Sequence, residues 1–128
     1  EGPRTYLGVA MAGFPNLFAI TGPGSPAVLA NMVPGAEQHV EWIGDCIGFA
    51  RERGASRIEA TLAAEDDWVA RNGEAAHGHL RSTCNSWYVG ANISGKARVF
   101  TPYISGLPSY LRACERVVAD GYAGFTFG

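Results

Sequence analysis

The most regular apolar pattern of the chain lies between residues 37 and 53. Apolar residues recur there at the three- and four-residue spacing of one helix face: Val40, Ile43, Ile47 and Ala50. Gly54 follows at the position where glycine commonly ends a helix. We therefore predict a helix over this segment.

Two more segments have helix signals. Thr61 is a suitable N-cap, and the acidic run 65–67 after it suits the positive end of a helix, with its carboxylates facing solvent. We expect this helix to run to about Leu80. A third helix is predicted from about Pro108 to Asp120, because proline is tolerated in the first turn and a glycine follows the last one.

The strand signals are fewer and weaker. Residues 17–20 (LFAI) form an unbroken apolar run, which predicts a strand buried on both faces of a parallel sheet. Residues 57–60 and 125–127 are weaker candidates. These segments cannot make a self-sufficient parallel sheet, so we expect the missing strands to belong to sequence outside this chain. The predicted fold class is α/β with few strands of its own.

Residues 21–35 are rich in glycine and proline, which predicts neither a regular helix nor a central strand. Residues 22–27 match the dinucleotide pattern G-x-G-x-x-[G/A]. However, Pro23 and Pro26 remove two amide donors, and Pro34-Gly35 delays the helix that should bind the phosphates. Two interpretations stay open. The segment is a turn-rich connector, or backbone N–H groups near Asn31 and Met32 face a cofactor that gains negative charge, such as a reduced flavin.

Residues 86–98 (SWYVGANISGKAR) combine two aromatic residues, two glycines and two cations without a helical stripe. Such a composition is typical of a mobile loop that closes over a ligand. For Trp87 and Tyr88, composition leaves ligand contact and hydrophobic core as equal alternatives.

Composition excludes several classes of partner. The 128 residues are 47% hydrophobic and carry a net charge of −2, which is typical of one soluble domain. Nucleic acid and anionic membranes attract basic surfaces, so we expect neither as a partner, and we expect a cytoplasmic protein. No apolar run approaches the roughly 20 residues of a membrane span.

The potential metal ligands show no metal-binding pattern. Cysteines 46, 84 and 114 lack a Cys-x-x-Cys spacing and are expected to be buried free thiols. Histidines 39, 77 and 79 are expected on helix surfaces. We therefore predict no metal site.

Five segments together resemble a known family. They are AGFPNLF (12–18), TGPGSP (21–26), EQHVEWI (37–43), IEAT (58–61) and SWYVGANI (86–93). In this order they resemble the C-terminal part of the FAD- and NADPH-dependent Baeyer-Villiger monooxygenases, of the cyclohexanone and phenylacetone monooxygenase type. The resemblance covers almost the entire chain.

The resemblance implies a fragment of a flavoprotein with two dinucleotide-binding domains. Residues 1–55 would supply the closing strand and helix of the FAD-binding domain, and residues 56–128 a C-terminal extension with an NADP-covering loop. The family uses FAD, NADPH and O2 to insert one oxygen atom into a ketone, giving an ester or lactone. Its catalytic arginine and dinucleotide fingerprints lie upstream, so we expect no catalytic residue here and an inactive chain without the remainder of the flavoprotein.

The resemblance also assigns roles to individual residues. Those that would contact cofactors are Asn31 and Met32 for FAD and Trp87 for NADP. Those that would line the ketone pocket are Ala27, Val28, Leu29 and Thr101. Two alternatives remain: a related flavin monooxygenase that oxidises nitrogen or sulfur, and a binding or assembly module without catalysis.

Overall fold

The computed structural model describes residues 2–27 and 30–128, with the backbone alone at positions 81 and 82. Within these residues the longer helices are α1 (Met32–Glu52), α2 (Leu62–Ala76) and α4 (Leu107–Ala119). The short elements are the single turn α3 (Leu80–Thr83) and the 3-10 turn η1 (Trp87–Val89). The strands β1 (Ile58–Ala60) and β2 (Phe125–Phe127) form a two-stranded antiparallel sheet.

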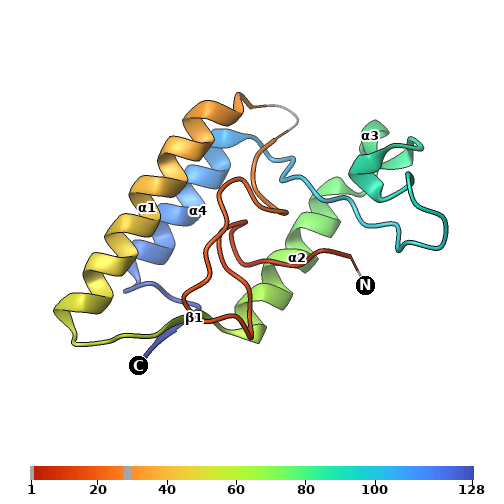
Figure 1. Cartoon of the computed structure of the whole chain (residues 1–128). Helices are drawn as coiled ribbons and strands as arrows, with labels where there is room; N and C mark the ends of the chain where they lie inside the picture. Colours follow the sequence, from red (N-terminus) through yellow and green to blue (C-terminus); the bar gives the residue numbers. More distant parts are fainter. Residues whose placement is uncertain (1, 28–29) are drawn as a thin grey trace.

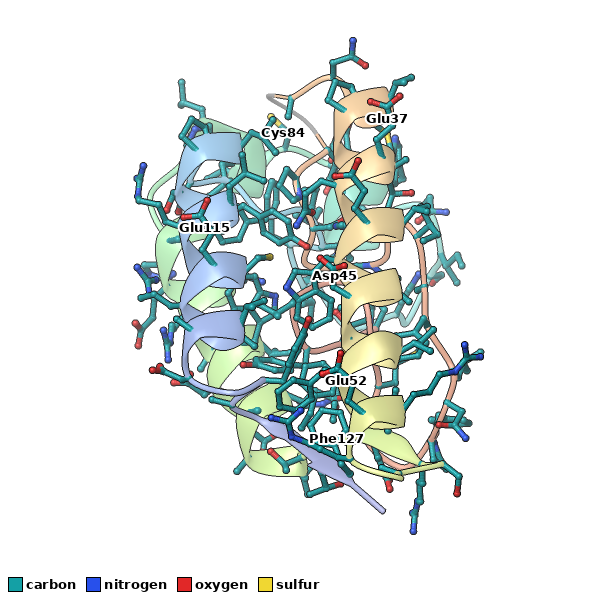
Figure 2. The ribbon with its side chains drawn as sticks, turned by 90° about the vertical axis from the view of Figure 1, so that its left-hand side faces the viewer. Glu37, Asp45, Glu52, Cys84, Glu115 and Phe127 are labelled. Carbon is teal, nitrogen blue, oxygen red and sulfur yellow. The ribbon has the colours of Figure 1, made fainter. Side chains whose placement is uncertain are left out.

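Helices α1 and α4 lie side by side, and irregular N-terminal loops lie between them and α2 (Figures 1 and 2). Aromatic side chains fill the space between these elements: Tyr6, Trp42, Trp68, Tyr110 and Tyr122. A second, smaller cluster of Ala76, Val89, Phe100 and Ile104 joins the end of α2 to the segment that follows α3. That segment extends away from α1 and α4, at the edge of the molecule (Figure 1).

Helix α1 begins earlier than its sequence pattern predicts. The Asn31 side chain accepts a hydrogen bond from the Val33 N–H and so caps the helix at Met32. Pro34 falls in the first turn, where no intrahelical N–H is needed, so the prediction that residues up to 35 are non-helical was wrong. The predicted apolar face of this helix was also wrong at its first residue. Val40 was expected in the core but is 60% exposed, and the preceding residue, His39, is buried instead.

Helix α2 confirms Thr61 as its N-cap, since the Thr61 hydroxyl accepts the Ala64 N–H at 3.2 Å. The helix ends at Ala76, before the predicted Leu80, because Gly78 adopts a left-handed φ of +81°. Helix α4 agrees with its prediction within one residue at each end.

Of the three strand predictions, the one with the strongest apolar signal is wrong and the two weaker ones are confirmed. Residues 17–20 form no strand: Phe18 makes a single antiparallel bridge to Ala10, and Leu17 and Ile20 are 49% and 45% exposed. A short apolar run specifies a buried strand only where neighbouring strands cover it, and neither described strand pairs with this run. The two weaker candidates are confirmed, and they pair with each other, Ile58 opposite Phe127.

No helix among the described residues is long and apolar enough to cross a membrane.

Candidate functional site

The loop before α1 is held against a distant segment of the chain. The Gly24 N–H donates to the Thr101 carbonyl at 2.6 Å, and the Tyr103 N–H donates to the Ser25 carbonyl at 2.9 Å. Ala27 follows this paired stretch and is half-buried. The structure thus brings two predicted pocket residues, Ala27 and Thr101, onto neighbouring backbone segments.

The remaining predicted residues of this loop lie at the start of α1. Val28 and Leu29 lie outside the described residues. Met32 is the first residue of α1 and is 45% exposed. The first N–H groups of a helix have no partner within it, and their end of the helix favours negative charge. The side-chain oxygen of Asn31 is occupied by the cap, so the backbone of Asn31 and Met32 is the part suited to an anionic group.

Thr101 also connects the loop to the aromatic segment 86–98. Its N–H and its hydroxyl both donate to the Tyr88 carbonyl, at 2.9 and 3.2 Å. The hydroxyl proton is therefore engaged, which leaves the methyl group and the oxygen lone pairs for other contacts. One continuous path of hydrogen bonds runs from Gly24 through Thr101 to Tyr88.

Trp87 projects from this path. Val89 is 5% exposed and packs into the smaller core cluster, whereas Trp87 is 62% exposed. The Trp87 and Tyr88 rings lie 4.0 Å apart between centroids. Gly90 closes the turn with a left-handed φ of +73° and donates its N–H to the Trp87 carbonyl. A core role for Trp87 is therefore wrong, and ligand contact remains a prediction.

A hollow of about 640 Å³ lies between the end of α2 and the aromatic segment. Its lining combines apolar and polar residues, among them Ala76, Val89, Phe100, His77 and Arg98. The Arg98 guanidinium donates to the Asn85 side-chain oxygen at 3.0 Å, which joins the two ends of the segment that carries Trp87. This volume is within the range of small-molecule sites.

A second groove, of about 410 Å³, runs between α1 and α4. Figure 2 shows Asp45 and Glu115 on this face, one from each helix. Of the residues predicted from the sequence to contact a ligand, none that the structure describes lines this groove.

Trp68 supports the site, and sequence reasoning missed it. It is 5% exposed, its indole N–H donates to the Gly24 carbonyl at 3.1 Å, and its ring stacks on Tyr103 at 5.3 Å between centroids. A buried indole N–H needs an acceptor, so a tryptophan on the inner face of α2 was the available signal.

Glu65 is the second missed residue. Its side chain is 6% exposed and accepts hydrogen bonds from the Arg4 Nε and the Ala12 N–H, at 3.0 and 2.8 Å. The expectation of a solvated acidic turn is therefore wrong for Glu65, although the side chain of Asp66 is 57% exposed. The partners of Glu65 lie more than 50 residues away in sequence, which no local pattern reveals.

His39 is also buried, which corrects its expected place on a helix surface. It is 1% exposed, and burial lowers its pKa below the ordinary value. Its two ring nitrogens lie 2.9 Å from the Thr21 N and 2.7 Å from the Tyr110 hydroxyl. Of the cysteines, Cys46 and Cys114 are buried and free as expected, whereas Cys84 is exposed.

No family model matches the chain. It is 44% identical over 126 residues to the phenazine N-monooxygenase PhzNO1 of Lysobacter antibioticus, covering 98% of this chain and 23% of that protein. It is 40% identical to the acetone monooxygenase (methyl acetate-forming) of Gordonia sp. and to a Baeyer-Villiger monooxygenase of Pseudooceanicola batsensis, each over 95% of this chain. The chain thus spans about a quarter of the length of these curated relatives.

Solved structures of monooxygenases match the chain over a similar share of their length. The closed crystal structure of a cyclohexanone monooxygenase matches with a TM-score of 0.94 and 41% identity, over 100% of this chain and 24% of that chain. A steroid monooxygenase bound to NADP matches with a TM-score of 0.89 and 48% identity, over 98% and 23%. In sequence and in fold, this chain is therefore similar to about a quarter of the length of these monooxygenases.

Proposed function

We propose that this chain is the C-terminal part of an FAD- and NADPH-dependent Baeyer-Villiger monooxygenase with two dinucleotide-binding domains. The complete enzyme would insert one oxygen atom from O2 into a ketone to give an ester or lactone. The observation that carries the proposal is the match of nearly the whole chain to ketone monooxygenases in both sequence and fold. Structures bound to NADP, and to FAD with NADP, are among the matches.

In this proposal the chain supplies binding surfaces and no catalytic residue. The backbone of Asn31 and Met32 would contact FAD, which fits the exposed positive end of α1. Bound FAD would supply the redox chemistry, taking electrons from NADPH and passing one oxygen atom of O2 to the ketone. Ala27, Val28, Leu29 and Thr101 would line the ketone pocket, and the pairing of the loop with residues 101–103 supports the assignment of Ala27 and Thr101.

Trp87 would cover the bound NADP and exclude water. Its 62% exposure supports this role, because a large aromatic side chain kept at the surface is available to a ligand. The adjoining hollow and the left-handed Gly90 suit a segment that packs against a flat ring.

Trp87→Ala in the complete enzyme tests the proposal. Losing the aromatic contact should weaken NADPH binding by about 1–3 kcal/mol, or roughly 5- to 150-fold, and lower the product formed per NADPH consumed. Phe14→Ala is the matched control, because Phe14 is similarly exposed, at 60%, and lies outside the segment. Unchanged binding and coupling in the Trp87 variant would contradict the proposed role.

N-oxidation is the second candidate, favoured by the 44% identity to a phenazine N-monooxygenase. The complete protein would be given a cyclic ketone and a phenazine separately with NADPH, and the products identified by mass spectrometry. A lactone supports the first proposal, whereas an N-oxide alone supports the second. A purified complete protein without flavin absorbance would favour a binding module.

A further inference from the structure

We propose that His39 is a positioning residue that fixes residues 21–27, the described part of the loop before α1, through the backbone N–H of Thr21. The inference rests on the proposed function, because this loop carries residues assigned to the ketone pocket and to FAD. His39 lies on α1 itself, two turns after Met32. It therefore ties the start of the loop to the helix on which the loop ends.

The backbone at Thr21 shows why such a support is needed. Thr21 has a φ of +53°, in the left-handed region, where a β-branched residue is strained. Its N–H donates to the Nδ1 of His39 at 2.9 Å. A strained conformation persists only where surrounding contacts determine it, and this hydrogen bond acts directly on the strained residue.

The hydrogen bonds around His39 fix its tautomer. Because Nδ1 accepts from Thr21, it carries no proton, so Nε2 carries the proton and donates to the Tyr110 hydroxyl at 2.7 Å. The Tyr110 hydroxyl in turn donates to the Leu7 carbonyl at 2.6 Å. The result is a one-directional chain of hydrogen bonds, from the loop through α1 and α4 to the N-terminal segment.

The surroundings keep the ring neutral. His39 is 1% exposed and Tyr110 is fully buried. The titratable groups on the α4 side are Tyr110 and its neighbour Cys114, and burial raises the pKa of both. The loop before α1 contacts His39 through the Thr21 N–H, and the N-terminal segment contacts Tyr110 through the Leu7 carbonyl. Neither of these backbone groups is charged. A proton on Nδ1 would break the bond to Thr21, because a doubly protonated ring has no acceptor.

Two conservative variants separate the two bonds of His39. In His39→Asn the side-chain oxygen takes nearly the place of Nδ1 and keeps the acceptor for Thr21. In His39→Gln the side-chain nitrogen takes nearly the place of Nε2 and keeps the bond to Tyr110. Both remove a similar part of the buried ring, so a loss of packing affects them alike.

The experiment compares both variants in the complete FAD-loaded protein. Hydrogen exchange in the peptide covering residues 21–32 should rise about tenfold in His39→Gln and stay near the unmutated value in His39→Asn, on the scale of one lost buried hydrogen bond. The KM for the ketone should rise about tenfold in His39→Gln alone, while kcat changes less than twofold.

Equal changes in the two variants, in exchange or in KM, would overturn the proposal and leave His39 as packing alone. Hydrogen exchange can be measured whether or not the protein is active. If the two variants differ in exchange but the protein oxidises no ketone, the proposed function is refuted and the positioning role of His39 is retained. If His39→Gln does not fold, the unmutated protein is compared with His39→Asn from about pH 8 to about pH 5. Hydrogen-exchange rates in residues 21–32 are first corrected for the intrinsic pH dependence of amide exchange. The corrected rates should rise at low pH in the unmutated protein alone, and an equal rise in both proteins would overturn the proposal.

Discussion

Glu65→Ala should destabilise the fold far more than Asp66→Ala, although both carboxylates bind the same arginine. Arg4 contacts Glu65 through Nε and Asp66 through its Nη2 group. The side chain of Glu65 is 6% exposed and that of Asp66 is 57% exposed. The two variants therefore differ chiefly in the burial of the carboxylate that is removed.

The expected magnitudes follow from the contacts. Glu65 accepts two hydrogen bonds as a buried carboxylate, from Arg4 and from the Ala12 N–H. Each hydrogen bond to a charged group contributes about 1.5–3 kcal/mol. Arg4 is 30% exposed and keeps its contact with Asp66, so part of this loss is offset by water, and we expect about 2–4 kcal/mol for Glu65→Ala. The exposed pair with Asp66 should contribute less than about 1 kcal/mol.

The assay is urea denaturation of the 128-residue chain, followed by tryptophan fluorescence. Trp68 lies one turn after Glu65 on the buried face of α2, so it reports on the same helix. Glu65→Gln is the matched intermediate, since it keeps a side-chain oxygen acceptor without the charge. Equal losses for Glu65→Ala and Asp66→Ala, or a loss below about 1 kcal/mol for Glu65→Ala, would refute the argument from burial.

Two further predictions concern groups whose pKa is shifted by burial. In the native chain iodoacetamide should alkylate Cys84 alone. Cys46 and Cys114 are buried, and their pKa values are raised to about 12 and about 11. Early labelling of either buried thiol, detected by mass spectrometry, would contradict this prediction. The free energy of unfolding should fall as the pH drops below about 6.5. The reason is that burial lowers the pKa of His39 in the folded chain, so the unfolded chain binds the proton first. Denaturation measurements on His39→Asn should lack this part of the pH dependence.

Local sequence signals predicted the elements whose stability depends on nearby residues. The Thr61 cap, the ends of α4 and the strand at 58–60 agree with their predictions, because caps, helical stripes and β-prone residues act within a few positions. The signals failed where a local rule had an exception. Pro34 fits in the first turn of α1, and Gly78 ends α2 before its predicted end.

The candidate site could be named from the sequence only in part. The five motifs together gave the family resemblance, composition singled out residues 86–98 as a ligand loop, and the resemblance assigned a role to Trp87. The exposure of Trp87 was not predictable, because its surroundings depend on Val89 packing against Phe100 in the smaller core cluster.

The sequence by itself determined where the three longer helices lie, the Thr61 cap, the weak strands and the family resemblance, since these depend on short-range spacing and on motifs in order. The tertiary structure alone decided which polar groups are buried and what they bind. In the described part of the chain no strand covers residues 17–20, whereas Glu65 and His39 are enclosed by segments distant in sequence. Gly24 and Thr101 lie 77 positions apart and meet in one hydrogen bond. Burial and long-range pairing depend on where the whole chain brings its segments together, and no local pattern encodes that position.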